Sequence, residues 1–189
     1  MNVLEKDIED LIFTAIEDNR DALAPKGLPV LLKGNYYRQF ELGGYGRADI
    51  IGVEIGHRLK GYRDIRIHVI ELKKEQIDYA TLNQALGYAK GMQQLILQEL
   101  RECTFDVRIS LVGKRIDLSG CFVYLTDYAE NIGFYTYRLD FFEGLKFYRQ
   151  YAYSQPSSCL PKYSIVDDWK HDLKRARWSR QQPVAELEF

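Results

Sequence analysis

The stretch "IHVIELKKEQIDYATLNQALGY", residues 67–88, places a charged pair in an apolar strand and follows it closely with a helical pattern. Side chains alternate between the faces of a strand, so Glu71 and Lys73 share one face with Val69. A buried carboxylate is costly unless a cation or hydrogen-bond donors accompany it. The pattern therefore predicts a strand over residues 65–73 that carries a functional carboxylate, followed by a helix over about 79–101.

Apolar periodicity predicts the other elements. A first helix is expected over residues 3–23, ending at "APKG". The remaining segments divide as follows: strands over 29–33, 36–42, 46–54, 106–116 and 121–128, and a strand that passes into a helix over 134–151. This order predicts an α/β or α+β fold with a central mixed β-sheet flanked by helices. The composition changes after "SQPSSCLP", which predicts a domain over residues 1–155 and a C-terminal extension over 156–189 whose role is open.

Composition excludes some classes of protein. With 189 residues, 46% of them hydrophobic, the chain can bury a core. The net charge of −1 gives no global affinity for polyanions, but residues 33–74 hold nine Lys and Arg against five acids, enough for local docking. Three widely spaced cysteines without a CxxC motif favour a reducing compartment. Without an apolar signal core or a run near the roughly 18 residues that span a bilayer, we expect a cytoplasmic protein with no membrane partner.

A second acid interrupts the apolar segment "GRADIIG", residues 46–52. If Asp49 and Glu71 face each other on neighbouring strands, their repulsion requires compensating charge, and Lys73 supplies only one unit. Two carboxylates, a main-chain carbonyl and several waters suit Mg²⁺. Such an ion polarises a phosphoryl oxygen, while a nearby lysine orients or deprotonates the attacking water. This combination suggests metal-assisted hydrolysis of a phosphodiester.

Four segments in order resemble the motifs of the PD-(D/E)XK nuclease superfamily. They read "LEKDIEDLI" (4–12), "GRADIIG", "VIELKK" (69–74) and "NQALGY" (83–88). Within it the chain is most similar to the RecB-type and NucS-like nucleases and the archaeal Holliday-junction resolvases, over about residues 4–115. The resemblance implies a restriction-endonuclease-like core with a four-stranded mixed sheet and cleavage of DNA with Mg²⁺ or Mn²⁺. Ala48 stands where the family name has proline.

The resemblance also implies roles for the strand residues. Asp49, Glu71 and the main-chain carbonyl of Leu72 would bind the metal, and Lys73 would act on the water. The connection between Asp49 and Glu71 is long, and it forms either a solvated hairpin or a basic contact to nucleic acid. The expected contacts in and beside it are Arg47, Arg58, Lys60, Arg63 and Arg66.

The helical residues have alternatives. By the resemblance, Gln84 would orient the water or a phosphate oxygen, with Tyr88 one turn further along the same face. Alternatively, Thr81 is an N-cap to which Gln84 reaches back, and Tyr88 fits the core equally well. Glu5 would complete the site from the first helix, and Glu9 is the alternative with similar spacing.

Other classes of function stay open beside the nuclease. One is a catalytically silent nucleic-acid-binding or assembly subunit with the same fold, and another is a restriction or defence-system component. Resolvase-like action would need a homodimer that places two sites on one junction. The form of the DNA and its sequence specificity are not encoded in the motifs.

Overall fold

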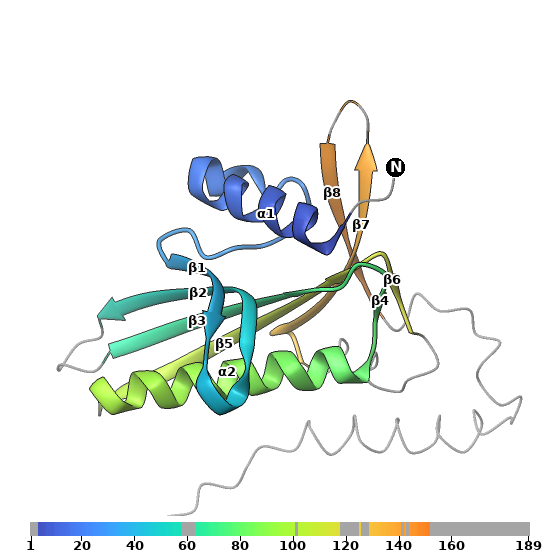
Figure 1. The fold of residues 1–189 in the computed structure, drawn as a ribbon. Coiled ribbons are helices and arrows are strands. Elements are labelled where there is room, and N and C mark those ends of the chain that lie inside the picture. The colour runs from blue at the N-terminus through green and yellow to red at the C-terminus, as the bar shows by residue number, and fades with distance from the viewer. Residues whose placement is uncertain are drawn as a thin grey trace, which may run out of the picture. The chain divides into compact units, whose positions relative to one another are not determined.

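A mixed six-stranded sheet in the order β1-β2-β3-β5-β7-β8 forms the centre of the protein (Figure 1). The computed structural model describes residues 4–57, 63–100, 102–117, 125, 129–140, 142 and 144–151. The strands are β1 (Asn35–Glu41), β2 (Arg47–His57), β3 (Arg63–Leu72), β5 (Cys103–Gly113), β7 (Ile132–Asp140) and β8 (Gly144–Gln150). β3 runs parallel to β5 and β5 to β7, while the other neighbours are antiparallel. Two short strands, β4 (Gln76–Ile77) and β6 (Arg115–Ile116), pair separately.

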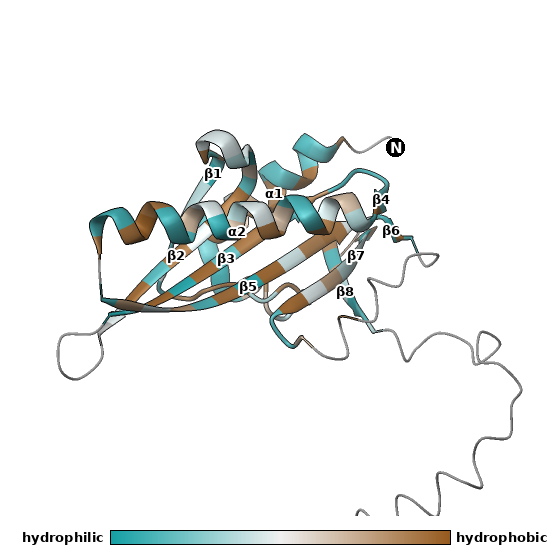
Figure 2. Ribbon diagram, turned by 90° about the horizontal axis from the view of Figure 1, so that it is seen from below, coloured by the Kyte–Doolittle hydropathy of each residue, from teal (hydrophilic) through white to brown (hydrophobic). Residues whose placement is uncertain are grey.

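Two helices cover opposite faces of the sheet, which confirms the predicted α/β arrangement (Figure 1). Helix α1 (Glu5–Asn19) continues into a 3₁₀ turn (Arg20–Ala22) and packs its Ile12 in one core with Ile70. Helix α2 (Tyr79–Glu99) packs its Ala85 in the other core with Val69. Figure 2 shows α2 lying across the apolar strands β3 and β5. Among the described residues, no helix combines the length and the apolar character needed to cross a membrane.

The alternation expected along β3 is confirmed, because Ile70 and Val69 lie in different cores. In β2 the strict alternation fails at one residue. Ala48 packs in the same core as Ile51 instead of lying with Ile50. The facing strand β1 bends here, since Gln39 has a φ of 50°, and this bend falls next to the functional site.

Two predicted elements are wrong. Residues 29–33 form no strand, because the Leu31 N–H donates to the Tyr36 hydroxyl at 2.7 Å instead of joining a ladder. The helix expected near the end of 134–151 is strand β8, which buries Leu145 and Phe147 in alternation after a turn at Gly144 (φ 73°). The predicted strand 121–128, apart from Leu125, and the boundary at residue 155 lie outside the described residues.

Helix α2 begins at Tyr79, as predicted, with Asp78 as its N-cap, so the alternative in which Thr81 is the N-cap is wrong. The Thr81 N–H and hydroxyl both donate to Asp78 Oδ1 at 2.8 Å, which satisfies a main-chain donor at the helix start. Thr81 occupies the third position of the helix and forms the capping box with Asp78, so Gln84 takes no part in it. The tight β3–β4 connection leaves the helix start beside the end of β3 (Figure 1).

The Asp78→Ala variant is expected to lower the free energy of unfolding by about 1 kcal/mol, because it removes this cap. Asp78→Asn keeps an acceptor at the same place and is expected to lose only a few tenths. Urea unfolding of both variants measures the difference. Equal losses in the two variants would show that the side-chain acceptor is not what starts the helix.

Candidate active site

A pocket of about 590 Å³ gathers polar residues from α1, β1, β2, the end of β3 and α2. The ladder between β2 and β3 pairs Ile50 with Ile70, which brings the next residues of the two strands, Asp49 and Glu71, to the same end of the sheet. The predicted residues that line the pocket are Glu5, Glu9, Arg47, Asp49, Glu71, Lys73, Gln84 and Tyr88. Residues separated by more than 80 positions in the sequence thus meet at one place.

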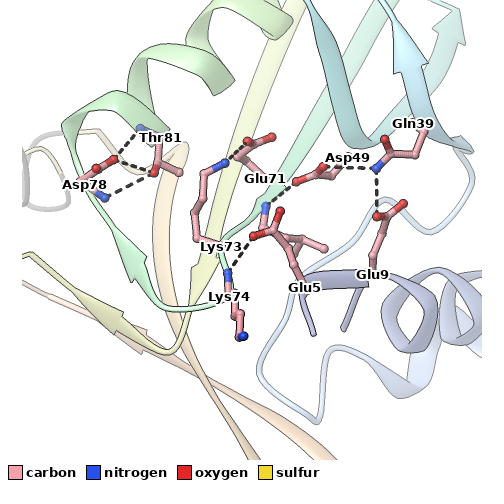
Figure 3. Close-up of polar contacts among 10 residues, drawn as sticks. Glu5, Glu9, Gln39, Asp49, Glu71, Lys73, Lys74, Asp78 and Thr81 are labelled. Atoms are coloured by element: carbon pink, nitrogen blue, oxygen red, sulfur yellow. Dashed lines mark hydrogen bonds and ion pairs between the residues drawn. The ribbon is translucent and has the colours of Figure 1, made fainter. Parts of the chain in front are cut away.

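Glu71 is a buried carboxylate with one unsatisfied oxygen. Its Oε1 accepts a hydrogen bond from Lys73 Nζ at 2.8 Å (Figure 3). Its Oε2 is buried and has no hydrogen-bond partner among the residues that the structure describes. Burial and then the neighbouring charge of Asp49 raise the pKa of Glu71 to about 7, although Lys73 opposes the rise. One ammonium group therefore does not compensate for the burial of this carboxylate and the charge of Asp49.

Asp49 is fixed by donors on both oxygens. Its Oδ2 accepts from the Leu72 N–H at 2.9 Å, and its Oδ1 from Gln39 Nε2 at 3.3 Å (Figure 3). Burial raises the pKa of Asp49, while the Leu72 N–H and the charge of Lys73 act against the rise. Two carboxylates whose charged forms are both disfavoured share one pocket.

These residues fit a hard divalent cation. The orphaned oxygen of Glu71 and the adjacent Asp49 offer oxygen ligands, and a double positive charge would offset their repulsion. Within the described ranges, no three His, Cys, Asp or Glu side chains are grouped to hold a metal by themselves. Main-chain carbonyl and water oxygens would have to complete the shell, which is typical of Mg²⁺ and not of structural Zn²⁺.

Lys73 is held in its charged form. Burial acts to lower its pKa, but the hydrogen bond to Glu71 and the charges of Glu71, Glu5 and Asp49 outweigh burial and raise the pKa. A protonated amine donates hydrogen bonds and stabilises negative charge, but it accepts no proton. Of the two roles considered for this lysine, the electrostatics favour orienting the water over deprotonating it.

The two acids of α1 differ in their partners. Glu9 is buried and binds Arg38 Nε at 2.6 Å and Gln39 Nε2 at 2.9 Å. Glu5 accepts only the Lys74 main-chain N–H, at 2.9 Å, among the contacts of the described residues (Figure 3). Arg38 pairs with Glu9, although the charges of both acids raise the pKa of Asp49. The charge of Glu5 also raises the pKa of Lys73, so Glu5 stays the preferred acid of the first helix.

Gln84 and Tyr88 lie on the α2 wall of the pocket. Gln84 is exposed, and the role considered for it, reaching back to the N-cap, belongs to Thr81. Tyr88 is buried in the core beneath α2, with Gly46 so close that an added Cβ would lie 3.3 Å from its ring. Burial and the charges of Glu71 and Asp49 raise the pKa of Tyr88. Tyr88 thus belongs to both the core and the pocket.

Of the described basic residues expected to contact nucleic acid, Arg47 lines the pocket, and Arg63 and Arg66 do not. Arg47 lies 3.6 Å from Glu41. Arg66 pairs with Glu54 at 3.0 Å, and Arg63 begins β3, about 26 Å along the strand from Glu71 at about 3.3 Å per residue. Arg58 and Lys60 lie outside the described residues.

Three further residues of the pocket were not predicted, namely Lys6, Arg38 and Gln39. Arg38 binds both Glu9 and Asp10. The pattern of "YYRQFEL" predicts a strand and nothing more about the site. Its one cation, Arg38, is compatible with an ion pair to the acidic first helix. No local pattern identifies which acid it meets.

Comparison of the sequence with protein-family models and with curated proteins, and of the structure with solved structures, gave no match.

Proposed function

We propose that this protein is a metal-dependent nuclease that hydrolyses phosphodiester bonds of DNA with Mg²⁺ or Mn²⁺, on a restriction-endonuclease-like core of the PD-(D/E)XK type. One observation carries the proposal. Asp49 and Glu71 lie together at the end of two strands, Lys73 binds Glu71, and one oxygen of Glu71 has no partner within the described part of the chain. This combination is destabilising in the absence of a cation and useful in its presence.

The metal would be held by Asp49, Glu71 and the Leu72 carbonyl, and when bound it polarises a phosphoryl oxygen and acidifies a water. The Lys73 ammonium donates to the attacking water or to a non-bridging oxygen and stabilises the negative charge that develops there. The water would lose a proton to solvent as its oxygen forms a bond to phosphorus, while the bond from phosphorus to the leaving sugar oxygen breaks and that oxygen takes up a proton. Gln84, one turn before Tyr88, reaches the same pocket with an amide that orients these oxygens.

The pocket also has a means of meeting a polyanion. Lys6 and Arg47 are exposed and line its mouth, and neither is committed to the carboxylates that would bind the metal. Their charges would attract the phosphates on either side of the cleaved bond, and binding would therefore weaken as salt increases.

The Lys73→Ala variant is expected to reduce cleavage by about 100-fold or more, because it removes the donor that stabilises the developing charge. Lys74→Ala is the matched control, since Lys74 contacts Glu5 through its main-chain N–H, which the substitution keeps. Cleavage is measured on supercoiled, linear, single-stranded and branched DNA with Mg²⁺, Mn²⁺ or EDTA, with Asp49→Ala as a second inactive variant.

Metal-dependent cleavage that is lost in Lys73→Ala and Asp49→Ala but kept in Lys74→Ala would support the proposal. Cleavage that survives in both pocket variants would place the activity elsewhere or in a contaminant. Intact DNA under every condition, with DNA still bound, would instead favour the non-catalytic binding subunit.

A further inference from the structure

Gln39 has an unusual backbone conformation in the middle of edge strand β1. Its φ of 50° is the one positive φ among the non-glycine residues that the structure describes. A side chain with a Cβ is disfavoured in this region, so surrounding contacts must hold it there. Strained residues of this kind cluster at functional sites, which directs attention to what the Gln39 side chain contacts.

The Gln39 amide joins α1 to the candidate metal ligand. Its Nε2 donates to Glu9 Oε2 at 2.9 Å and to Asp49 Oδ1 at 3.3 Å (Figure 3). An amide nitrogen carries two hydrogens, one for each carboxylate. Arg38 binds the other oxygen of Glu9, which anchors the far end of this chain of contacts.

The register explains why this residue can reach Asp49. Arg38 pairs with Ile50 and Phe40 with Ala48, so Gln39 lies opposite Asp49 on the neighbouring strand. Gln39 and Asp49 themselves form no ladder pair, because the left-handed conformation of Gln39 interrupts the pairing for one residue before it resumes at Phe40. The same bend thus accounts for both the irregular strand and the direction of the amide.

We infer that Gln39 is a positioning residue that fixes the carboxylate of Asp49 for the cation, an inference that rests on the proposed function. The Leu72 N–H holds one oxygen of Asp49 and Gln39 holds the other, so the carboxylate cannot rotate freely. The chemistry of the amide suits the task. An arginine or lysine here would neutralise Asp49, and an acid would add repulsion, whereas a neutral donor orients the ligand and leaves its charge for the metal.

The test is Gln39→Gly, because glycine accepts the positive φ while losing the amide. Mn²⁺ affinity is measured by electron paramagnetic resonance of the free ion, and thermal unfolding is followed in parallel. We expect Gln39→Gly to bind Mn²⁺ about 10-fold to 100-fold more weakly, the usual effect of losing a residue that orients a metal ligand. The unfolding temperature is expected to change little, because the relief of backbone strain offsets the loss of the hydrogen bonds to Glu9 and Asp49. Gln39→Asn, which also tolerates this backbone but holds its amide one carbon short, is expected to show a loss of affinity too.

The outcomes separate the inference from the proposed function. Wild-type protein and both variants binding Mn²⁺ equally would overturn the inference and leave the nuclease proposal standing. Weaker binding by the variants, together with a wild type that binds Mn²⁺ but cleaves no DNA, would support the inference and overturn the nuclease. A wild type that binds no Mn²⁺ would overturn both.

Discussion

Replacing Glu71 by glutamine is expected to abolish cleavage and, in the same protein, to stabilise the metal-free fold above neutral pH. Cleavage should fall by about 1000-fold or more, since the site loses a charged metal ligand. The stability effect has a separate cause. Burial and Asp49 raise the pKa of Glu71 from 4.5 to about 7, so folding favours the protonated form.

The sign follows from proton linkage. A folded pKa above the unfolded value means that the stability due to the proton is complete below pH 4.5 and is lost as the pH rises through about 7. Each unit of difference between the folded and unfolded pKa corresponds to about 1.4 kcal/mol, so the free energy of unfolding of wild-type protein is lower by about 3 kcal/mol at pH 8. Glutamine carries no titrating proton, so the Glu71→Gln variant escapes this loss.

Urea unfolding of wild-type and Glu71→Gln protein at pH 5 and pH 8, in EDTA, measures the difference. Glu75→Gln serves as the control, because Glu75 is exposed and 3.8 Å from its partner Lys114. Mg²⁺ is expected to raise the stability of wild-type protein at pH 8 but not that of Glu71→Gln. If the variant were no more stable than wild type at pH 8, the charged Glu71 carboxylate would not destabilise the fold.

The second large effect is expected on the other side of the sheet, at a buried histidine. His68 is fully buried, with Nδ1 3.1 Å from the Tyr36 hydroxyl and Nε2 2.9 Å from Ser110 Oγ. Burial, with a smaller contribution from the charge of Arg108, lowers the pKa of His68 from 6.5 to about 3. The folded protein thus keeps this ring neutral, while the unfolded chain takes up a proton below pH 6.5.

Stability should therefore fall as the pH decreases from about 6.5 towards 3, because only the unfolded state binds the proton there. Each pH unit below the unfolded pKa corresponds to about 1.4 kcal/mol, so His68 lowers the free energy of unfolding by about 3 kcal/mol at pH 4. His68→Asn is expected to be less stable than wild type at pH 7, because its shorter amide leaves part of the network unpaired. The gap between the two proteins should narrow by this amount between pH 7 and pH 4.

Guanidinium unfolding at several pH values measures that gap, and the comparison with wild type removes the contributions of other groups. Tyr36→Phe is a useful companion, because it removes one hydrogen-bond partner of His68 without removing the titrating ring. It should keep the wild-type slope while lowering stability. A gap between His68→Asn and wild type that is constant with pH would mean that His68 takes up its proton equally in the folded and unfolded states, so that burial does not lower its pKa.

Local patterns were sufficient for much of the architecture. The period-two alternation of β3 and the apolar stripe of α2 were both predicted, because each depends on residues near one another in the sequence. The failures have physical causes. Residues 29–33 are apolar enough for a strand, but the Tyr36 hydroxyl captures the Leu31 N–H. Residues 144–150 form a strand instead of the expected helix, because alternate side chains are buried against the sheet.

The candidate site divides in the same way. Glu71 and Lys73 share a face because they are two positions apart in an extended segment, and this holds for any strand, whatever the rest of the fold. The choice between Glu5 and Glu9 is different, because both have similar spacing to the apolar stripe of α1. It depends on Arg38, which comes from a strand 29 residues further along and pairs with Glu9. Which side chains of distant elements form ion pairs depends on how the sheet and helices pack together, and local periodicity does not predict it.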